Sequence, residues 1–332
     1  MVIKEEIVEH YSGYNPKLRG VIPILRKGYY EVLNYTVGGD APKNFIALYE
    51  YEENSGIRRT NVDTWPRYIA KVGHKWYPLE SINEYLFNQL GEELGLKMAH
   101  SRLMIFGRQL RFLSRYFLKK NETLVHGAEI FYGYLSDKDF VHKIEEQQLA
   151  RKFLTFEFAL TSIMTVFQED WEQIMADFVK MLVFDAVTGN NDRHFYNWGV
   201  VKHIENKHIP VFAPIYDSAR GLFWNEAESK IETWYKDMKQ IDKRIAKYAE
   251  SSKPKTGWEG MDDLNHFDLI GKIFCYDIRY KEVCRSIINR QNKEKVLFLV
   301  KTKFSHFYSS LRIDAINRCL AYRFDRLIDI IK

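Results

Sequence analysis

The chain has 332 residues, 46% of them hydrophobic and 28% charged, which is typical of a folded protein with one large domain or two of ordinary size. Its formal net charge of +5 comes from basic residues interleaved with acidic ones, so the charge does not indicate direct binding of nucleic acid, and no apolar stretch is long enough to span a membrane. The three cysteines, an odd count without a Cys-x-x-Cys pair, exclude a disulfide framework and a zinc ribbon and favour a reducing compartment.

Up to about residue 135, short β-rich runs alternate with turns. The runs are 20–37, 45–53, 67–72, 101–107 and 109–118. The turns Arg-Lys-Gly at 26–28 and Phe-Gly-Arg-Gln at 106–109 are typical of β-hairpins. One helix is predicted over 79–94, where apolar residues recur at helical spacing. Ser81 is its expected N-cap, and Gly95 is expected to end it.

From about residue 136 onward the pattern becomes helical. Apolar residues recur every three or four positions over 140–167 and 171–189, and again in the tail that starts at Asp262. A β-hairpin is predicted within this part, over 198–217, with its turn near Glu205–Lys207.

The order of these elements predicts the fold class. A small sheet with one helix comes first, and a larger helical part with one hairpin follows, in which the loop 251–260 precedes the last helices. This order is that of an α+β, two-lobed, protein-kinase-like fold, with a β-rich nucleotide-binding lobe at 1–118 and a helical catalytic lobe at 119–332. Because one fold serves many activities, the function must be inferred from the side chains.

The most informative side chains lie in the segment 187–201, between an apolar helix and a strand. Asp192 and Asn197 stand five residues apart, as do the Asp and Asn of the catalytic loop in protein kinases. Asp217 follows an apolar strand twenty residues later. Phosphoryl transfer requires an Asp that orients a hydroxyl and takes its proton, and hard oxygen ligands for Mg²⁺. The pattern therefore predicts phosphoryl transfer.

A cation for nucleotide phosphates is predicted at Lys71, which ends a β-rich run, and Glu84 in the following helix could hold it as an ion pair. Gly38 and Gly39 would let backbone N–H groups approach phosphate oxygens, with Lys43 adding charge. Each feature alone has an ordinary explanation, because strand-ending lysines are usually surface residues and Gly-Gly-Asp is a common hairpin turn. Their combination in this order favours a nucleotide site.

The sequence resembles the HipA-like serine/threonine kinases, found largely in bacteria as toxins of toxin–antitoxin pairs. The resemblance runs from about residue 36 to 275. It is carried by a catalytic loop with Asn190, Asp192, His194 and Asn197, a metal motif with Pro214, Tyr216 and Asp217, a glycine stretch with Gly38, Gly39, Pro42 and Lys43, and the segments 69–71, 83–96 and 257–273. Asp40 and Ala41 depart from the pattern, since the family more often has Ala-Arg there.

The resemblance implies a fold related to protein and phosphatidylinositol kinases, with ATP and Mg²⁺ as cofactors. Asp192 would be the catalytic base, and Asn197 and Asp217 would bind Mg²⁺. Lys71, paired with Glu84, would hold the α- and β-phosphates of ATP.

Further residues receive expected roles around this centre. The backbone that contacts adenine is expected at the hinge formed by Ser114, Arg115, Tyr116 and Phe117. Asn190, His194 and Asp185 are expected to brace the catalytic loop, with Asp185 as a partner of Arg193 or His194. Because kinases of this family can phosphorylate a Ser or Thr in their own glycine loop, Thr36 is a candidate site of autophosphorylation.

The resemblance also implies partners. These are a protein substrate, the chain itself and a small helix-turn-helix antitoxin. The chain has less sequence before its glycine stretch than the longer toxins of the family, and in size it is similar to compact members, some of which act as secreted effectors. The N-terminus lacks the basic and then apolar pattern of a signal peptide, so a bacterial cytoplasmic location is expected, with secretion into a host cell as the alternative.

Several other functions are weighed against this one. His194 with Asp192 resembles part of a metal site, but His203 and His208 flank a polar turn and are expected to be exposed. A serine hydrolase would need a Gly-x-Ser-x-Gly turn, which is absent. A lipid or small-molecule kinase and a non-catalytic ATP-binding pseudokinase remain the alternatives, the first because phosphatidylinositol kinases share the Asp-Arg-His-x-x-Asn motif.

Overall fold

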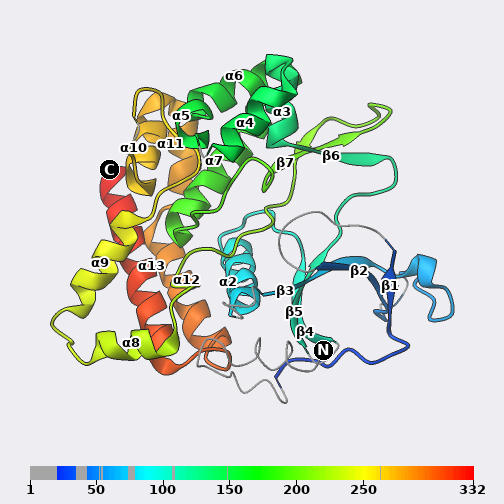
Figure 1. The fold of residues 1–332 in the computed structure, drawn as a ribbon, viewed down its shortest axis with the longest axis horizontal. Coiled ribbons are helices and arrows are strands. Elements are labelled where there is room, and N and C mark those ends of the chain that lie inside the picture. Colours follow the sequence, from blue (N-terminus) through cyan, green and yellow to red (C-terminus); the bar gives the residue numbers. More distant parts are fainter. Residues whose placement is uncertain are drawn as a thin grey trace.

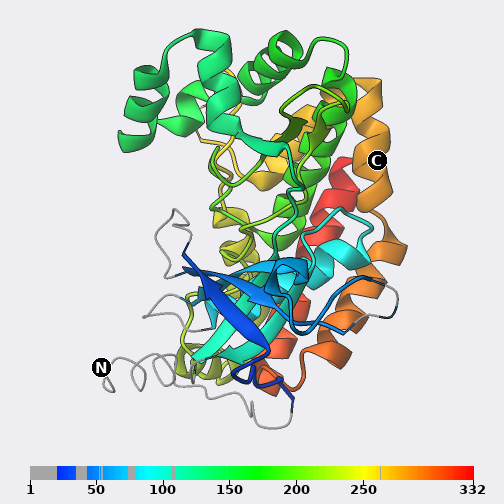
Figure 2. The ribbon, with the colours of Figure 1, turned by 90° about the vertical axis from the view of Figure 1, so that its right-hand side faces the viewer.

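The molecule consists of a five-stranded sheet and a larger body of helices (Figures 1 and 2). The computed structural model describes residues 21–34, 43–51, 53, 55–73, 79–106, 109–147, 149–261 and 263–332. This arrangement confirms the predicted α+β, two-lobed order. The connection 116–121 leads from the sheet into the helical body, and the proposed division after residue 118 falls within it.

The five-stranded sheet is antiparallel throughout. Its spatial order is β1 (Tyr30–Leu33), β2 (Lys43–Leu48), β3 (Arg67–Val72), β5 (Gln109–Arg115) and β4 (Ser101–Phe106). The register places Lys71 of β3 opposite Lys43 on one side and Phe112 on the other. A short 3₁₀ helix, Val62–Thr64, precedes β3.

Helix α2 (Glu80–Glu93) lies between the sheet and the helical body (Figure 1). It packs on β4 and β5 with one face and on α12 with another. The prediction of this helix is confirmed, and Gly95, at a φ of +72°, follows its end as expected. The prediction that Ser81 caps it is wrong, because Leu79 is the N-cap residue and Ser81 is buried within the first turn.

Of the two predicted hairpins, one is confirmed by the pairing of its strands, although residues 107 and 108 of its turn lie outside the described residues. Strands β4 and β5 pair as a hairpin up to Phe106 and Gln109. The turn at 26–28 does not join two paired strands. Instead, Ile24 forms a parallel bridge with Ile105, so the chain before the turn extends the edge at β4 while β1 pairs with β2 on the far side of the sheet.

A second, three-stranded sheet lies in the helical body and consists of β6 (Glu122–His126), β7 (Gly199–His203) and β8 (Val211–Phe212). Strands β7 and β8 form the predicted hairpin, with Asn206 in the left-handed region at its turn. Strand β6 and the helix α3 that follows it were not predicted, because five residues of strand and nine of helix give too short a pattern.

The helical body encloses the main apolar core. Its helices are α3 (Gly127–Leu135), α4 (Lys138–Glu146), α5 (Ala150–Phe153), α6 (Phe156–Phe167), α7 (Trp171–Thr188), α8 (Glu228–Tyr235), α9 (Ile241–Ser251), α10 (His266–Tyr276), α11 (Ile278–Ile287), α12 (Arg290–Lys303) and α13 (Ser310–Ile330). Helix α7 packs on α6, α10, α11 and α13, and the second half of it is almost wholly buried. It ends at Gly189 in the left-handed conformation, which turns the chain into the segment 190–197.

The predicted loop 251–260 is fastened to the body at Gly257. Its N–H and C=O bond to Leu154 and Phe156, and a Cβ at this position would lie 1.7 Å from the carbonyl oxygen of Arg151. Gly257→Ala should therefore destabilise the protein by about 1–3 kcal/mol, because backbone must move away from backbone. Gly133→Ala is the matched control, since a Cβ there meets nothing closer than 3.6 Å within a helix. Urea denaturation of both variants measures this, and equal stabilities would contradict the packing described.

Two further expectations concern the whole chain. The three cysteines are free, with Cys284 and Cys319 buried and Cys275 exposed, as expected of a protein without disulfides. No helix in the described ranges combines the length and the apolar character needed to cross a membrane.

Candidate active site

The alternation of side chains along β3 directs Lys71 toward α2. Tyr68 and Ala70 belong to a small apolar cluster on one face of the sheet, so Lys71 points to the opposite face. Its Nζ lies 2.6 Å from Oε1 of Glu84 in α2 and 2.7 Å from Oδ1 of Asp217. The structure thus brings together the predicted lysine, its predicted glutamate partner and a predicted metal ligand, which are far apart in the sequence.

Burial and charge oppose each other at Lys71 and Asp217. Burial alone would lower the pKa of the Lys71 ammonium, but Asp217 and Glu84 outweigh burial and raise it. Burial alone would raise the pKa of Asp217, but Lys71, Lys43 and Arg193 outweigh burial and hold the pKa well below its usual range. Lys71 and Asp217 therefore stabilise each other in their charged forms.

Arg193 fastens the catalytic loop (residues 190–197) to its surroundings. It is 3% exposed, and its Nε and Nη2 donate to the two carboxylate oxygens of Asp185 in α7, at 2.9 and 3.1 Å. Its Nη1 donates to the carbonyl oxygens of Asn197 and Tyr216, both at 2.7 Å, and Nη2 also donates to Ser218. One guanidinium therefore fixes the loop and the Asp217 segment to the same buried helix.

Within the loop, Asp192 accepts hydrogen bonds through its backbone carbonyl oxygen. The carbonyl oxygen of Asp192 accepts from the side-chain amide of Asn197 and from the N–H of His194, both at 2.9 Å. Because the Asn197 amide donates through nitrogen, its oxygen is the atom that could serve as a metal ligand. The Asp192 carboxylate instead forms an ion pair with Arg220, a residue outside the loop.

The remaining loop residues have bracing contacts. Asn190 donates to Asp185 at 2.9 Å, so Asp185 holds both Asn190 and Arg193. His194 accepts from the N–H of Tyr196 at 3.3 Å through Nδ1, and burial lowers the pKa of its ring. These contacts fit the expected structural roles.

The histidines of the hairpin differ from their expectation. His208 is exposed, but His203 is buried, because its ring Nδ1 accepts from the N–H of Glu205 at 3.1 Å inside the turn. The expectation that His203 is exposed is therefore wrong. In the described ranges there is no cluster of three or more His, Cys, Asp and Glu side chains that could hold a metal ion, so the histidine metal site receives no support.

Sequence reasoning missed the cation nearest to Asp192. Nη1 of Arg220 lies 3.0 Å from Oδ2 of Asp192, and its Nε lies 3.3 Å from Oε1 of Glu80 in α2. The signal available was its place three residues after Asp217, but spacing alone does not indicate which way such a side chain turns.

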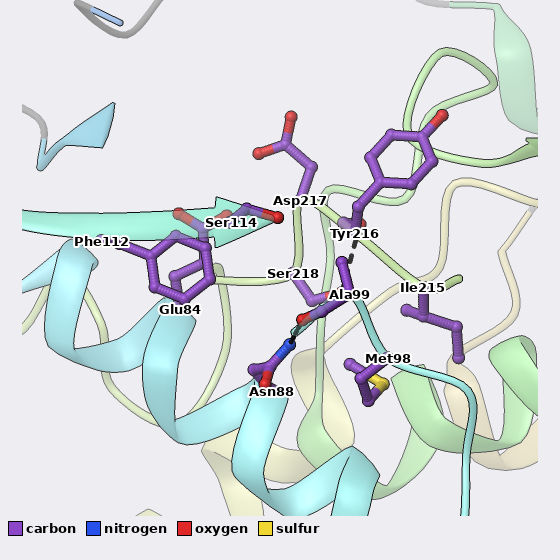
Figure 3. Close-up of a pocket in the computed structure, with 10 residues that line it drawn as sticks. All are labelled: Glu84, Asn88, Met98, Ala99, Phe112, Ser114, Ile215, Tyr216, Asp217 and Ser218. Carbon is purple, nitrogen blue, oxygen red and sulfur yellow. Dashed lines mark hydrogen bonds between the residues drawn. The ribbon is translucent and has the colours of Figure 1, made fainter. Parts of the chain in front are cut away.

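Figure 3 shows a hollow next to Asp217, between α2, β5 and the segment 215–218. Ser114 of the expected hinge lines it, while the Asp217 carboxylate points away from Asn88 and Met98 at its base. Of the other hinge residues, Arg115 and Tyr116 are exposed and Phe117 is half-buried, with its ring centroid 6.0 Å from that of Tyr216. The hinge segment therefore borders the hollow that contains Asp217.

The glycine stretch cannot be placed, because Thr36, Gly38 and Gly39 lie outside the described residues. Lys43, at the start of β2, is described and lies opposite Lys71 in the register. Its positive charge contributes to the low pKa of Asp217.

The donor set beside Lys71 fits Mg²⁺. Asp217 offers a carboxylate and Asn197 a carboxamide oxygen, and the Arg193 contacts hold their two segments together. Mg²⁺ prefers one or two protein oxygen ligands and completes its shell with phosphate oxygens and water. Asp217 is held at a φ of +55°, a strained backbone conformation that tends to occur at functional sites.

Comparison with known proteins shows the family of the chain. The model of the HipA-like C-terminal domain matches residues 35–289, most of the chain. The chain belongs to the HipA-like kinase family. The resemblance drawn from the catalytic-loop and metal motifs is thereby confirmed.

Two solved structures have a similar fold. A Helicobacter pylori proinflammatory kinase, CtkA, superposes with a TM-score of 0.70 and 18% identity, covering 93% of this chain and 96% of that one. HipA from Shewanella oneidensis MR-1, solved with HipB and operator DNA, gives a TM-score of 0.52 and 14% identity, covering 99% of this chain and 71% of HipA. No curated protein sequence matches the chain. The HipA-like kinase fold is thus shared with both structures.

Proposed function

We propose that this HipA-like chain is an ATP-dependent protein serine/threonine kinase. The observation that carries the proposal is the contact of Lys71 with both Glu84 and Asp217, next to a loop that carries Asp192 and Asn197. Each part needed for phosphoryl transfer has a side chain of the right chemistry there.

Each residue has one task in the proposed mechanism. Lys71, kept charged by its two carboxylates, binds the phosphates of ATP. Asp217 and Asn197 would hold Mg²⁺, which would supply positive charge at the phosphate oxygens. Asp192 orients the acceptor hydroxyl and takes its proton as the phosphoryl group is transferred.

Lys71→Ala and Asp217→Ala should each weaken the binding of ATP in the presence of Mg²⁺ roughly tenfold or more, because a phosphate counter-charge or a metal ligand is lost. Isothermal titration calorimetry measures both affinities. Lys293→Ala is a matched control, since Lys293 forms an ion pair of similar length, 2.6 Å to Asp325, on a distant surface. Wild-type affinity in both site variants would refute the nucleotide site.

The protein acceptor and self-modification are finer parts of the proposal. Thr36 is proposed as an autophosphorylation site, because kinases of this family can phosphorylate a Ser or Thr in their own glycine loop, and a phosphate would add about −1.5 to −2 charges to that stretch. Intact-mass measurement after incubation with ATP, followed by peptide mapping, tests this. Phosphate found only at other positions would contradict it.

The biological setting is proposed from the comparisons. The likeness to CtkA, a proinflammatory kinase, at a TM-score of 0.70 supports a kinase that acts as an effector, and the likeness to HipA at 0.52 supports one that works as a toxin. A small helix-turn-helix antitoxin remains the proposed partner in the toxin case, because HipA was solved with HipB. Sequencing the neighbouring gene and co-purifying the protein from its own cell distinguish the two cases. These experiments also show whether the protein stays in the bacterial cytoplasm.

A further inference from the structure

Arg220 is fixed at its backbone between the catalytic loop and α2. Its carbonyl oxygen accepts from the N–H of Asn191 at 3.1 Å. The side-chain amide of Asn83 in α2 donates to the carbonyl oxygens on either side of Arg220, at 2.5 Å to Ala219 and 3.0 Å to Gly221. These hydrogen bonds fix the backbone of Arg220 beside the catalytic loop. The guanidinium can therefore move through its side-chain torsions while the backbone stays in place.

The guanidinium bridges two carboxylates. Nη1 lies 3.0 Å from Asp192 and Nε 3.3 Å from Glu80, while the ring of Trp224 lies 5.2 Å from the guanidinium carbon. Burial alone would lower the pKa of Arg220, but Asp192 and Glu80 outweigh it and raise the pKa. Its side chain is 35% exposed, so the guanidinium can be reached from the solvent side.

Arg220 and Lys71 are held in the same way. Glu80 and Glu84 stand one helical turn apart on α2, and each holds one cation. Each cation also binds one aspartate of the site, Lys71 at Asp217 and Arg220 at Asp192. The two glutamates of α2 thus hold two cations in the site. Lys71 lies at the metal end, beside Asp217, and Arg220 lies at the base end, beside Asp192.

The contact between Arg220 and Asp192 has to change during the reaction. The guanidinium engages Oδ2 of Asp192, so this oxygen is not free to meet an acceptor hydroxyl until the contact is broken. Two of the five N–H donors of a guanidinium make the contacts with Asp192 and Glu80, and its planar fork suits the oxygens of a phosphate. The negative charge of the ATP triphosphate would compete with the Asp192 carboxylate for the Arg220 guanidinium.

We propose that Arg220 binds the γ-phosphoryl group of ATP and in doing so releases Asp192 for the acceptor hydroxyl. This inference rests on the proposed kinase function, in which the transferred group would lie between Asp217, a residue that would hold Mg²⁺, and Asp192, the proposed base. Lys71, at the metal end, contacts the phosphates that remain with ADP. Arg220, at the base end, contacts the phosphate that leaves.

The affinities for ATP and ADP test the assignment without relying on activity. Calorimetry of the full chain with Mg²⁺ should show that Arg220→Gln lowers the affinity for ATP roughly tenfold or more and changes the affinity for ADP less than about twofold. Arg220→Lys, which keeps the charge but loses the fork, should fall between wild type and Arg220→Gln. Lys71→Ala should weaken both nucleotides.

Arg318→Gln is the matched control. Arg318 has the same 35% side-chain exposure and also bridges two carboxylates, Asp314 and Asp242, but away from the site. It should leave both affinities unchanged. Circular dichroism confirms that each variant is folded, and Arg220→Lys serves as the test should Arg220→Gln not fold.

The outcomes separate the two proposals. If wild-type protein binds both nucleotides and Arg220→Gln weakens both equally, or neither, Arg220 does not read the γ-phosphate and the inference is overturned while the nucleotide site stands. If wild-type protein binds neither ATP nor ADP, the kinase function itself fails, and the assignment of Arg220 fails with it.

Discussion

Asp192→Asn should reduce phosphoryl transfer by at least ~100-fold while it leaves the fold intact and the affinity for Mg²⁺-ATP at least as high as that of the wild type. The loop does not depend on the carboxylate, because Asn197 and His194 bond to the carbonyl oxygen of Asp192. Loss of the carboxylate charge also frees Arg220, its ion-pair partner. Single-turnover rates and calorimetric affinities, measured on the same preparation, separate chemistry from binding.

Asn197→Ala is the companion of this variant. It removes a proposed metal ligand together with the 2.9 Å hydrogen bond to Asp192, so it should lower the rate and also raise the Mg²⁺ concentration required. If Asp192 only capped the loop, asparagine would replace its hydrogen bonds and activity would survive. Near wild-type transfer by Asp192→Asn would therefore end the proposed mechanism.

Arg193→Met should cost roughly 3–5 kcal/mol of unfolding free energy, the largest stability effect expected at this site. The substitution leaves the carboxylate of Asp185 buried without its cation and removes hydrogen bonds to the carbonyl oxygens of Asn197 and Tyr216. Activity should be lost with it, because the loop and the Asp217 segment are no longer fastened together.

Urea denaturation measures the change, and Arg318→Met serves as the exposed control. The ion pairs of Arg318 lie at the surface, so this variant should lose about 1 kcal/mol or less. A similar small loss for Arg193→Met would show that the buried pair does not hold the catalytic loop.

Much of the fold follows from local pattern. The six residues of β3 and the helix α2 were predicted closely, because strand composition, apolar spacing and Gly95 all indicate the same boundaries. The failures are local features that tertiary contacts override. Ser81 does not cap α2, because the helix begins earlier, and the turn at 26–28 joins segments that pair with different strands.

The residues of the site likewise divide into those that the sequence predicted and those that it did not. Lys71, Glu84 and Asp217 were predicted from type and order, and the structure brings them within ion-pair distance. Arg220 was missed, because it belongs to no motif and its importance lies in a contact with Asp192 across the fold. The bidentate contact between Arg193 and Asp185 was anticipated only as one of two pairings.

The central claim is that this site transfers phosphate from ATP to a protein hydroxyl. The most direct test incubates the purified protein with Mg²⁺ and ATP labelled at the γ-phosphate, alone, with a bacterial lysate, with a host-cell lysate and with inositol lipids. We expect label on serine or threonine of a protein, and we expect none with Lys71→Ala or Asp192→Asn. Label on lipid alone, or bound ATP without any transfer, would contradict it.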